Sequence, residues 1–141
     1  MPRIETYNPQ AERDFYESNM YAGAVRAGDL LIVSGVIGFT FDHERKPFIP
    51  ASIEEEIQNL FNRLQGILAE AKLGMEDIVN FDTFMEASSF ADVLASFQEV
   101  KVKFLHCPFP AWTAVPVPFI SFPGARLEVK TVARFVDTAR R

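Results

Sequence analysis

Glu128 is the residue of this chain whose type and setting most favour chemistry. It lies between two apolar residues in the run Leu127-Glu128-Val129. A carboxyl group among apolar neighbours loses hydration, which disfavours its ionised form and suits it for proton transfer. A structural reading stays open, because Arg126 and Lys130 fall on the same strand face and either could pair with Glu128 on a solvated surface.

The remaining chemically capable residues do not form a cofactor site. His106 and Cys107 are adjacent, but neighbours at the end of a helix point apart, and a thiol–imidazole dyad is made by folding rather than by adjacency. His43 lies in a charged loop, so the histidines and the cysteine show no metal-ligand spacing. No glycine-rich phosphate loop occurs. The sequence predicts no metal and no cofactor.

Three blocks of sequence carry a resemblance to a known family. Tyr21 is followed thirteen residues later by Ser34-Gly35, and the other blocks are Phe109-Pro110-Ala111-Trp112-Thr113 and Leu127–Ala133. Together they resemble the reactive-intermediate deaminase family, RidA/YjgF, also called the L-PSP family. The resemblance extends from about Tyr21 to Ala133. It implies a chorismate-mutase-like fold and a homotrimer with small-molecule pockets between subunits.

Trp112 stands where the resembled family carries an arginine. In that family the arginine after Pro-Ala pairs with the carboxylate of a small imino acid, because guanidinium geometry matches a carboxylate. The indole of Trp112 offers one neutral donor and a broad π face, so it suits stacking on a planar ligand and cannot anchor an anion in the same way. The alternative is that Trp112 only fills a subunit interface.

The resemblance assigns roles to further positions. Glu128 matches the carboxylate that positions the water or the imine nitrogen during hydrolysis. Tyr21, Ser34 and Gly35 fall where relatives line the pocket. The alternatives are that Tyr21 is an ordinary strand tyrosine and that Ser34 is a small residue beside Gly35 that allows close packing. Three positions are apolar where relatives have asparagine, tyrosine and cysteine, which predicts a more apolar pocket: Leu94, Phe97 and Ala114.

Two functions remain open at this level. The first is hydrolytic deamination of an enamine or imine other than the small 2-imino acids, with a replacement cation supplied by Arg26, Arg126 or Lys130. The second is a homotrimer that binds a metabolite, or serves as a structural module, without turnover. Whether the protein is an enzyme is therefore left open.

The predicted elements form an α+β fold of order β-β-α-β-α-β-β. Residues 1–19 read as an irregular lead-in and residues 20–141 as one RidA-like domain. Strands are predicted at 21–26, 30–39, 78–85, 112–117 and 127–135. One helix starts at Ser52 with a capping box and stops at Gly74; the other runs from Ser89 to the prolines at 108 and 110. Both helices should cover one face of a mixed sheet.

Composition restricts partners and location. Apolar residues make up 48% of 141 residues and fourteen are phenylalanine, more than a small domain hides alone, so self-association is expected. The net charge of −5 argues against nucleic-acid binding. The chain has one cysteine, no signal-peptide pattern and no apolar run long enough for a bilayer, which predicts a cytoplasmic protein that does not enter membranes.

Overall fold

A mixed six-stranded sheet forms the centre of the computed structural model, which describes residues 4–136. Its strand order is β1-β2-β3-β8-β6-β7, and every neighbouring pair is antiparallel except β6 and β7. The strands are β1 (Thr6–Tyr7), β2 (Ala24–Ala27), β3 (Leu30–Val36), β6 (Ile78–Glu86), β7 (Ala111–Val117) and β8 (Leu127–Arg134). A separate hairpin pairs β4 (Thr40–Phe41) with β5 (Pro47–Phe48).

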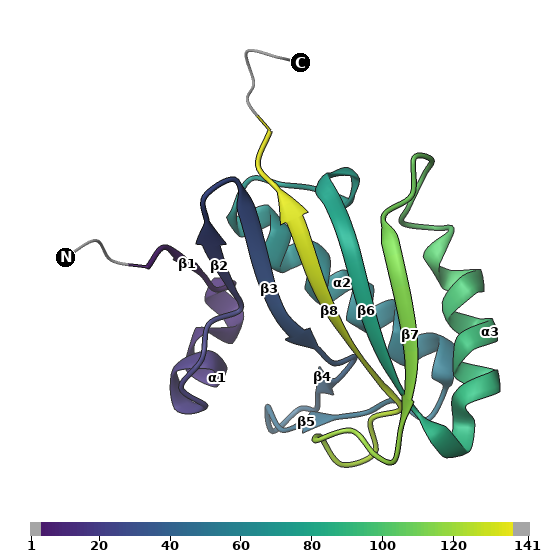
Figure 1. Ribbon diagram of the computed structural model, residues 1–141. Coiled ribbons are helices and arrows are strands. Elements are labelled where there is room, and N and C mark those ends of the chain that lie inside the picture. The colour runs from purple at the N-terminus through teal and green to yellow at the C-terminus, as the bar shows by residue number, and fades with distance from the viewer. Residues whose placement is uncertain (1–3, 137–141) are drawn as a thin grey trace.

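The two long helices, α2 (Ile53–Glu70) and α3 (Phe90–Lys101), lie behind the sheet in Figure 1 and cover one face. Short helical segments complete the fold: η1 (Gln10–Glu12), α1 (Arg13–Ser18), η2 (Met75–Asp77) and η3 (Ala87–Ser89). Ser52 caps α2 as predicted, because its side chain accepts a hydrogen bond from the backbone N–H of Glu55 at 3.2 Å.

The core lies between the sheet and these helices. Phe61 of α2, Phe81 of β6 and Phe97 of α3 are fully buried there. Within residues 4–136 no helix covers the opposite sheet face, and Ile32 of β3 and Val115 of β7 remain exposed at 37% and 39%. The predicted α+β order and the covering of one face are therefore confirmed.

Three local expectations were wrong. Residues 4–19 of the predicted lead-in are not irregular, because β1 joins the sheet beside β2 and α1 follows it. The left-handed residue after α2 is Lys72, with φ 60°, rather than Gly74, whose φ is −129°. The last residue of α3 is Lys101, well before Pro108, so the prolines do not end that helix.

No helix within residues 4–136 is both long enough and apolar enough to cross a bilayer.

Candidate functional site

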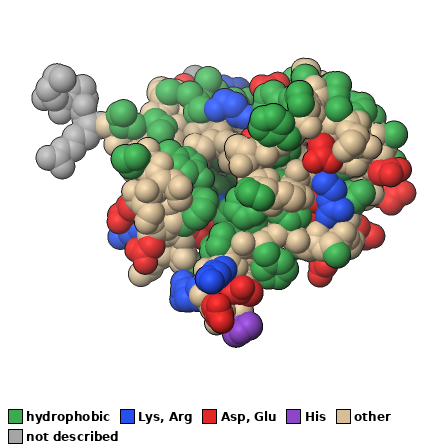
Figure 2. All heavy atoms as spheres, turned by 90° about the horizontal axis from the view of Figure 1, so that it is seen from below, with side chains coloured by type: hydrophobic (Ala, Val, Ile, Leu, Met, Phe, Trp, Pro, Cys, Tyr) green, Lys and Arg blue, Asp and Glu red, His purple; other side chains and the backbone are tan. Residues whose placement is uncertain are grey.

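A cavity of about 470 Å³ lies where α1, β3, β8 and the segment after β7 meet. Four of the predicted site residues line it: Tyr21, Ser34, Gly35 and Glu128. Figure 2 views the molecule from this end and shows hydrophobic side chains gathered around a hollow, with charged side chains of both signs at the margin. The structure thus brings together residues that are up to 107 positions apart in the sequence.

A bulge in β3 shapes the floor of the cavity. The register of β3 against β8 shifts between Val33, which pairs with Thr131, and Val36, which pairs with Val129. Two residues of β3 therefore face one residue of β8, as in a β-bulge, a device that often redirects side chains beside functional sites. The two residues that face this one position are Ser34 and Gly35, so β3 has one residue more than β8 here.

Glu128 projects from β8 on the sheet face without helices. Its side chain has no hydrogen-bond or ion-pair partner within the described residues, and burial raises the pKa of its carboxyl group. Gly35 gives the carboxylate its room, since a Cβ on Gly35 would lie 2.4 Å from Glu128 Oε1. The paired alternative is wrong: Arg126 binds Glu56 at 2.6 Å, and Lys130 forms no ion pair with Glu128.

Two hydroxyl-bearing side chains line the cavity with Glu128, and each has its own support. Ser34 Oγ donates to the carbonyl oxygen of Ala22 at 2.7 Å, which leaves its lone pairs available as acceptors. The Tyr21 ring packs edge-on against Tyr16, with centroids 5.1 Å apart. Burial raises the pKa of Tyr21, and the negative charge of Glu128 contributes in the same direction, so the phenol stays protonated and can donate.

Arg63 of α2 is the basic residue at this cavity. Its Nε donates to Glu12 Oε1 at 2.8 Å, and its Nη1 donates to the carbonyl oxygen of Ile37 at 2.5 Å. The guanidinium also lies 3.8 Å from the centroid of the Phe39 ring. Arg63 is thus held in place by Glu12, Ile37 and Phe39 before any ligand arrives.

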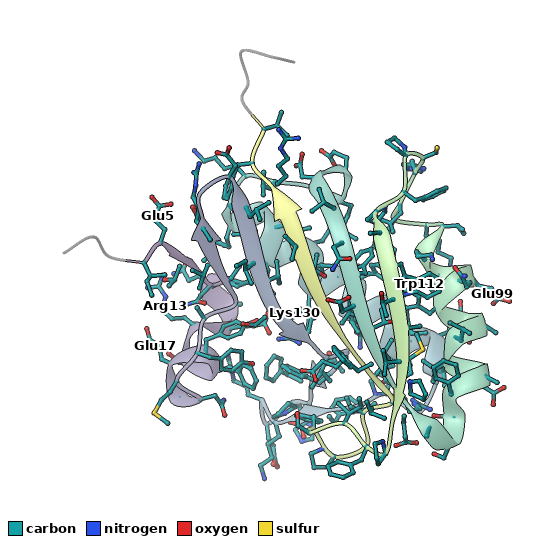
Figure 3. The ribbon with its side chains drawn as sticks, viewed as in Figure 1. Glu5, Arg13, Glu17, Glu99, Trp112 and Lys130 are labelled. Carbon is teal, nitrogen blue, oxygen red and sulfur yellow. The ribbon has the colours of Figure 1, made fainter. Side chains whose placement is uncertain are left out.

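Trp112, Ala114 and Leu94 do not line this cavity within one chain. Figure 3 shows Trp112 on β7 beside α3, at the opposite edge of the sheet from Arg13 and Glu17 of α1. The Trp112 indole stacks on Phe97 with centroids 5.7 Å apart, and its Nε1 donates to Thr83 Oγ1 at 2.9 Å. Leu94 packs on the main core from α3, and Ala114 is half-buried on β7.

A cation does lie beside Trp112. Lys101 Nζ is 3.7 Å from the centroid of the indole, a cation–π contact. Burial lowers the pKa of Lys101. This lysine was not among the candidates for a replacement cation.

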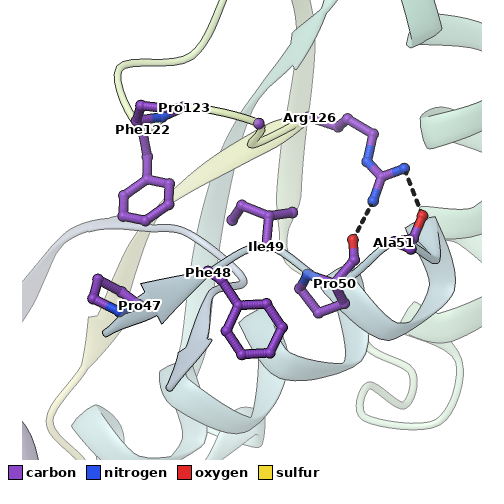
Figure 4. Close-up of a pocket in the computed structure, with 9 residues that line it drawn as sticks. Pro47, Phe48, Ile49, Pro50, Ala51, Phe122, Pro123 and Arg126 are labelled. Atoms are coloured by element: carbon purple, nitrogen blue, oxygen red, sulfur yellow. Dashed lines mark hydrogen bonds between the residues drawn. The ribbon is translucent and has the colours of Figure 1, made fainter. Parts of the chain in front are cut away.

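The three candidate cations lie elsewhere. Arg26 sits over the Phe135 ring at 4.0 Å and donates to the carbonyl oxygen of Gly28. Lys130 is exposed on β8. Arg126 borders a second hollow, drawn in Figure 4, where its two terminal nitrogens donate to the carbonyl oxygens of Pro50 and Ala51. Its Nε is bound to Glu56, so each guanidinium nitrogen of Arg126 has a protein acceptor.

Sequence reasoning missed several residues that line the cavity: Phe15, Asn19, Phe39, Arg63 and Phe122. One signal could have found Arg63. It falls three residues after Leu60 and four before Ile67, within the apolar stripe of α2, where a charged side chain needs a buried partner. Phe39 and Phe122 lie in irregular segments and Phe15 lies in the short helix α1, so none of the three belongs to a long periodic pattern.

Comparison with known proteins identifies the family. The family model described as Endoribonuclease L-PSP matches residues 12–135. The RutC family protein YjgH of Escherichia coli is 30% identical over 131 residues, covering 92% of this chain and 93% of that protein. The chain belongs to the RidA/YjgF/L-PSP family.

Two further likenesses agree with this assignment. Protein MMF1, mitochondrial, of Saccharomyces cerevisiae is 31% identical over 114 residues, covering 80% of this chain and 73% of that protein. The solved structure of protein YjgH superposes with a TM-score of 0.78 at 26% identity, over 97% of this chain and all of that one. The predicted family and its fold are confirmed.

Proposed function

We propose that the chain is a hydrolase that deaminates an enamine or imine other than the small 2-imino acids, at the cavity around Glu128. The observation that carries the proposal is the carboxylate itself: it is half-buried, lacks a protein partner within the described residues, and faces a cavity of small-molecule size. A carboxyl group with a raised pKa can exchange a proton nearer neutral pH than an exposed one.

Each group has a definable task in this reaction. Glu128 takes a proton from a water molecule whose oxygen attacks the imine carbon, and it returns that proton to the departing nitrogen. The balance is imine plus water giving a carbonyl compound plus ammonia. The Tyr21 hydroxyl can donate to the substrate, and Ser34 Oγ can accept from it. No step requires a metal.

The homotrimer belongs to the same proposal. The uncovered sheet face exposes apolar side chains, including Ile32 and Val115, which a second copy of the chain could bury. A site between copies would also allow Trp112, Ala114 and Leu94 to approach the Glu128 cavity of a neighbour. Size-exclusion chromatography with light scattering tests this, and a monomeric mass would leave those three residues outside the site.

The direct test is turnover. Imines generated in situ by an amine oxidase or amino-acid oxidase are supplied to the wild type and to Glu128→Gln, and release of ammonia is followed. Hydrolysis by the wild type that falls about a hundredfold in the variant supports the proposal. Equal rates in both proteins would remove Glu128 from the catalytic role.

A second function is favoured by a specific observation. Trp112 is engaged by Phe97, Lys101 and Thr83, in the position where the resembled family has its carboxylate-binding arginine. A protein with this substitution could bind a metabolite without converting it. Ligand-dependent stabilisation against heat with no turnover of any imine would favour this binding function.

A further inference from the structure

The charges that line the Glu128 cavity do not balance. Among the lining residues that the structure describes, Arg63 is the only base and Glu128 the only acid. Glu12 neutralises Arg63, since the carboxylate of Glu12 lies 2.7 Å from Arg63 Nη2 and both side chains are 12% exposed. Within the described residues of a single chain, Glu128 is therefore left with a charge that has no counterion.

Neighbouring cations do not correct this imbalance. Arg126, two residues before Glu128, is bound to Glu56 and to two backbone carbonyl oxygens. Lys130, two residues after it, is exposed and does not line the cavity. A negatively charged ligand would meet the Glu128 carboxylate and no uncompensated cation within this part of the chain. A positively charged ligand would supply the missing counterion.

The walls of the cavity suit a flat cation. Phe39 and Phe122 stack with their centroids 5.5 Å apart at 19°, and Phe15 lies 5.2 Å from Phe39. The Tyr21 ring continues this wall, 6.1 Å from Phe15. The negative faces of aromatic rings attract cations, and the rings also give a planar apolar body a surface on which to stack.

We propose that the cavity takes a planar aromatic or arylalkyl cation whose charged nitrogen carries N–H groups, such as an iminium or amidinium ion. The nitrogen would donate to the Glu128 carboxylate, and the aromatic body would lie against Phe15, Tyr21 and Phe122. This names the substrate class for the proposed hydrolysis and rests on that function. An iminium ion is the protonated imine, so the same carboxylate that holds it is placed to handle the water.

Three probes of one shape and three charges test the ligand class. Benzamidine is a cation, benzamide is neutral and benzoate is an anion. Isothermal titration calorimetry on the full chain at neutral pH should rank their affinities in that order, with benzamidine at least about tenfold tighter than benzamide, because a charge-assisted hydrogen bond exceeds a neutral one. Benzoate binding as tightly as benzamidine overturns the proposal.

Two variants locate the charge. Glu128→Gln should reduce benzamidine affinity to about that of benzamide. The matched control is Asp82→Asn, which removes another half-buried carboxylate from the same sheet face, one that does not line the cavity. Asp82→Asn should leave the ranking of the three probes unchanged. Equal losses in the two variants would show a general effect of charge and refute a role for Glu128.

A matched pair of substrates separates this proposal from the proposed function. The imines made from 2-phenylethylamine and from phenylalanine differ only by a carboxylate. Faster hydrolysis of the imine without the carboxylate supports both proposals. If the probes rank as expected but neither imine is hydrolysed, the ligand class stands and the hydrolase proposal fails. If the phenylalanine-derived imine reacts faster and benzoate binds best, the hydrolase proposal stands and the cation proposal fails.

Discussion

Gly35→Ala should disable the Glu128 site while leaving the protein folded. The added Cβ would lie 2.4 Å from Glu128 Oε1 and 2.8 Å from its Cδ, whereas ordinary contacts begin at 3.4 Å. The carboxylate must therefore move by about 1 Å. The atoms that move are the end of a flexible side chain, and the φ of Gly35 lies outside the left-handed region, so alanine can adopt the backbone conformation.

The expected effect on function is large and the effect on stability small. A displacement of about 1 Å at a reacting group can cost about a hundredfold in rate. We expect that loss in kcat/KM for the 2-phenylethylamine-derived imine, with a fall in benzamidine affinity. The free energy of unfolding in urea should change by less than about 1 kcal/mol.

Two comparisons make this test specific. Gly66→Ala adds the same methyl group to an exposed position of α2 with no atom within 4 Å, so it should stabilise the helix by about 0.5–1 kcal/mol and leave activity unchanged. In a Glu128→Gln background, Gly35→Ala should cost little more, because both changes act through one side chain. A Gly35→Ala protein with activity and benzamidine affinity within about twofold of the wild type would refute the reasoning.

Three further predictions concern stability. Glu128→Gln should raise Tm by a few degrees at pH 7, because the raised pKa of Glu128 means that its ionisation destabilises the folded state. The gain in Tm should vanish below pH 4.5, the ordinary pKa, where the carboxyl group is protonated in both states. Calorimetry from pH 4 to 8 checks both statements. Glu56→Ala should cost about 3 kcal/mol in urea unfolding, because it removes the acceptor of the hydrogen bonds from the Arg126 backbone N–H and Nε, and a change under about 1 kcal/mol would contradict this. Trp112→Phe should lower the free energy of unfolding by about 1 kcal/mol, because the hydrogen bond to Thr83 is lost. Trp112→Arg should lower it by about 3 kcal/mol or more, because the ring packing against the core is lost as well. Equal losses of stability in the two variants would contradict this account.

The regular elements could be predicted because their signals are local. The stripe of α2 and the two-residue turn between β2 and β3 depend on spacing within a few residues, and Gly28 takes the positive φ that such a turn requires. The ends of the helices and strands were harder to predict from the sequence. Lys72 takes the left-handed conformation despite its side chain, so the glycine two positions later gave a misleading stop signal.

The site could be predicted only in part, and the reason is geometric. Tyr21, Ser34, Gly35 and Glu128 were found through the family resemblance, and they line one cavity. Arg63 was missed because its partners are distant in the sequence: Glu12 lies 51 residues away. No local sequence pattern predicts which residue makes a contact across 51 positions. A charged residue within an apolar stripe does indicate that some buried partner must exist.

Two charged residues lie in the apolar stripe of α2, and each has a partner of opposite charge. Glu56 and Arg63 are seven positions apart and share one side of the helix. Glu56 binds Arg126, and burial still raises its pKa, so the pair offsets only part of the cost of desolvation. Arg63 is balanced by Glu12. Both of these charges are compensated, whereas the Glu128 carboxylate at the cavity has no ion-pair partner within residues 4–136. Our proposal gives that part to a cationic ligand, and this is why the charge of the ligand is the property to measure.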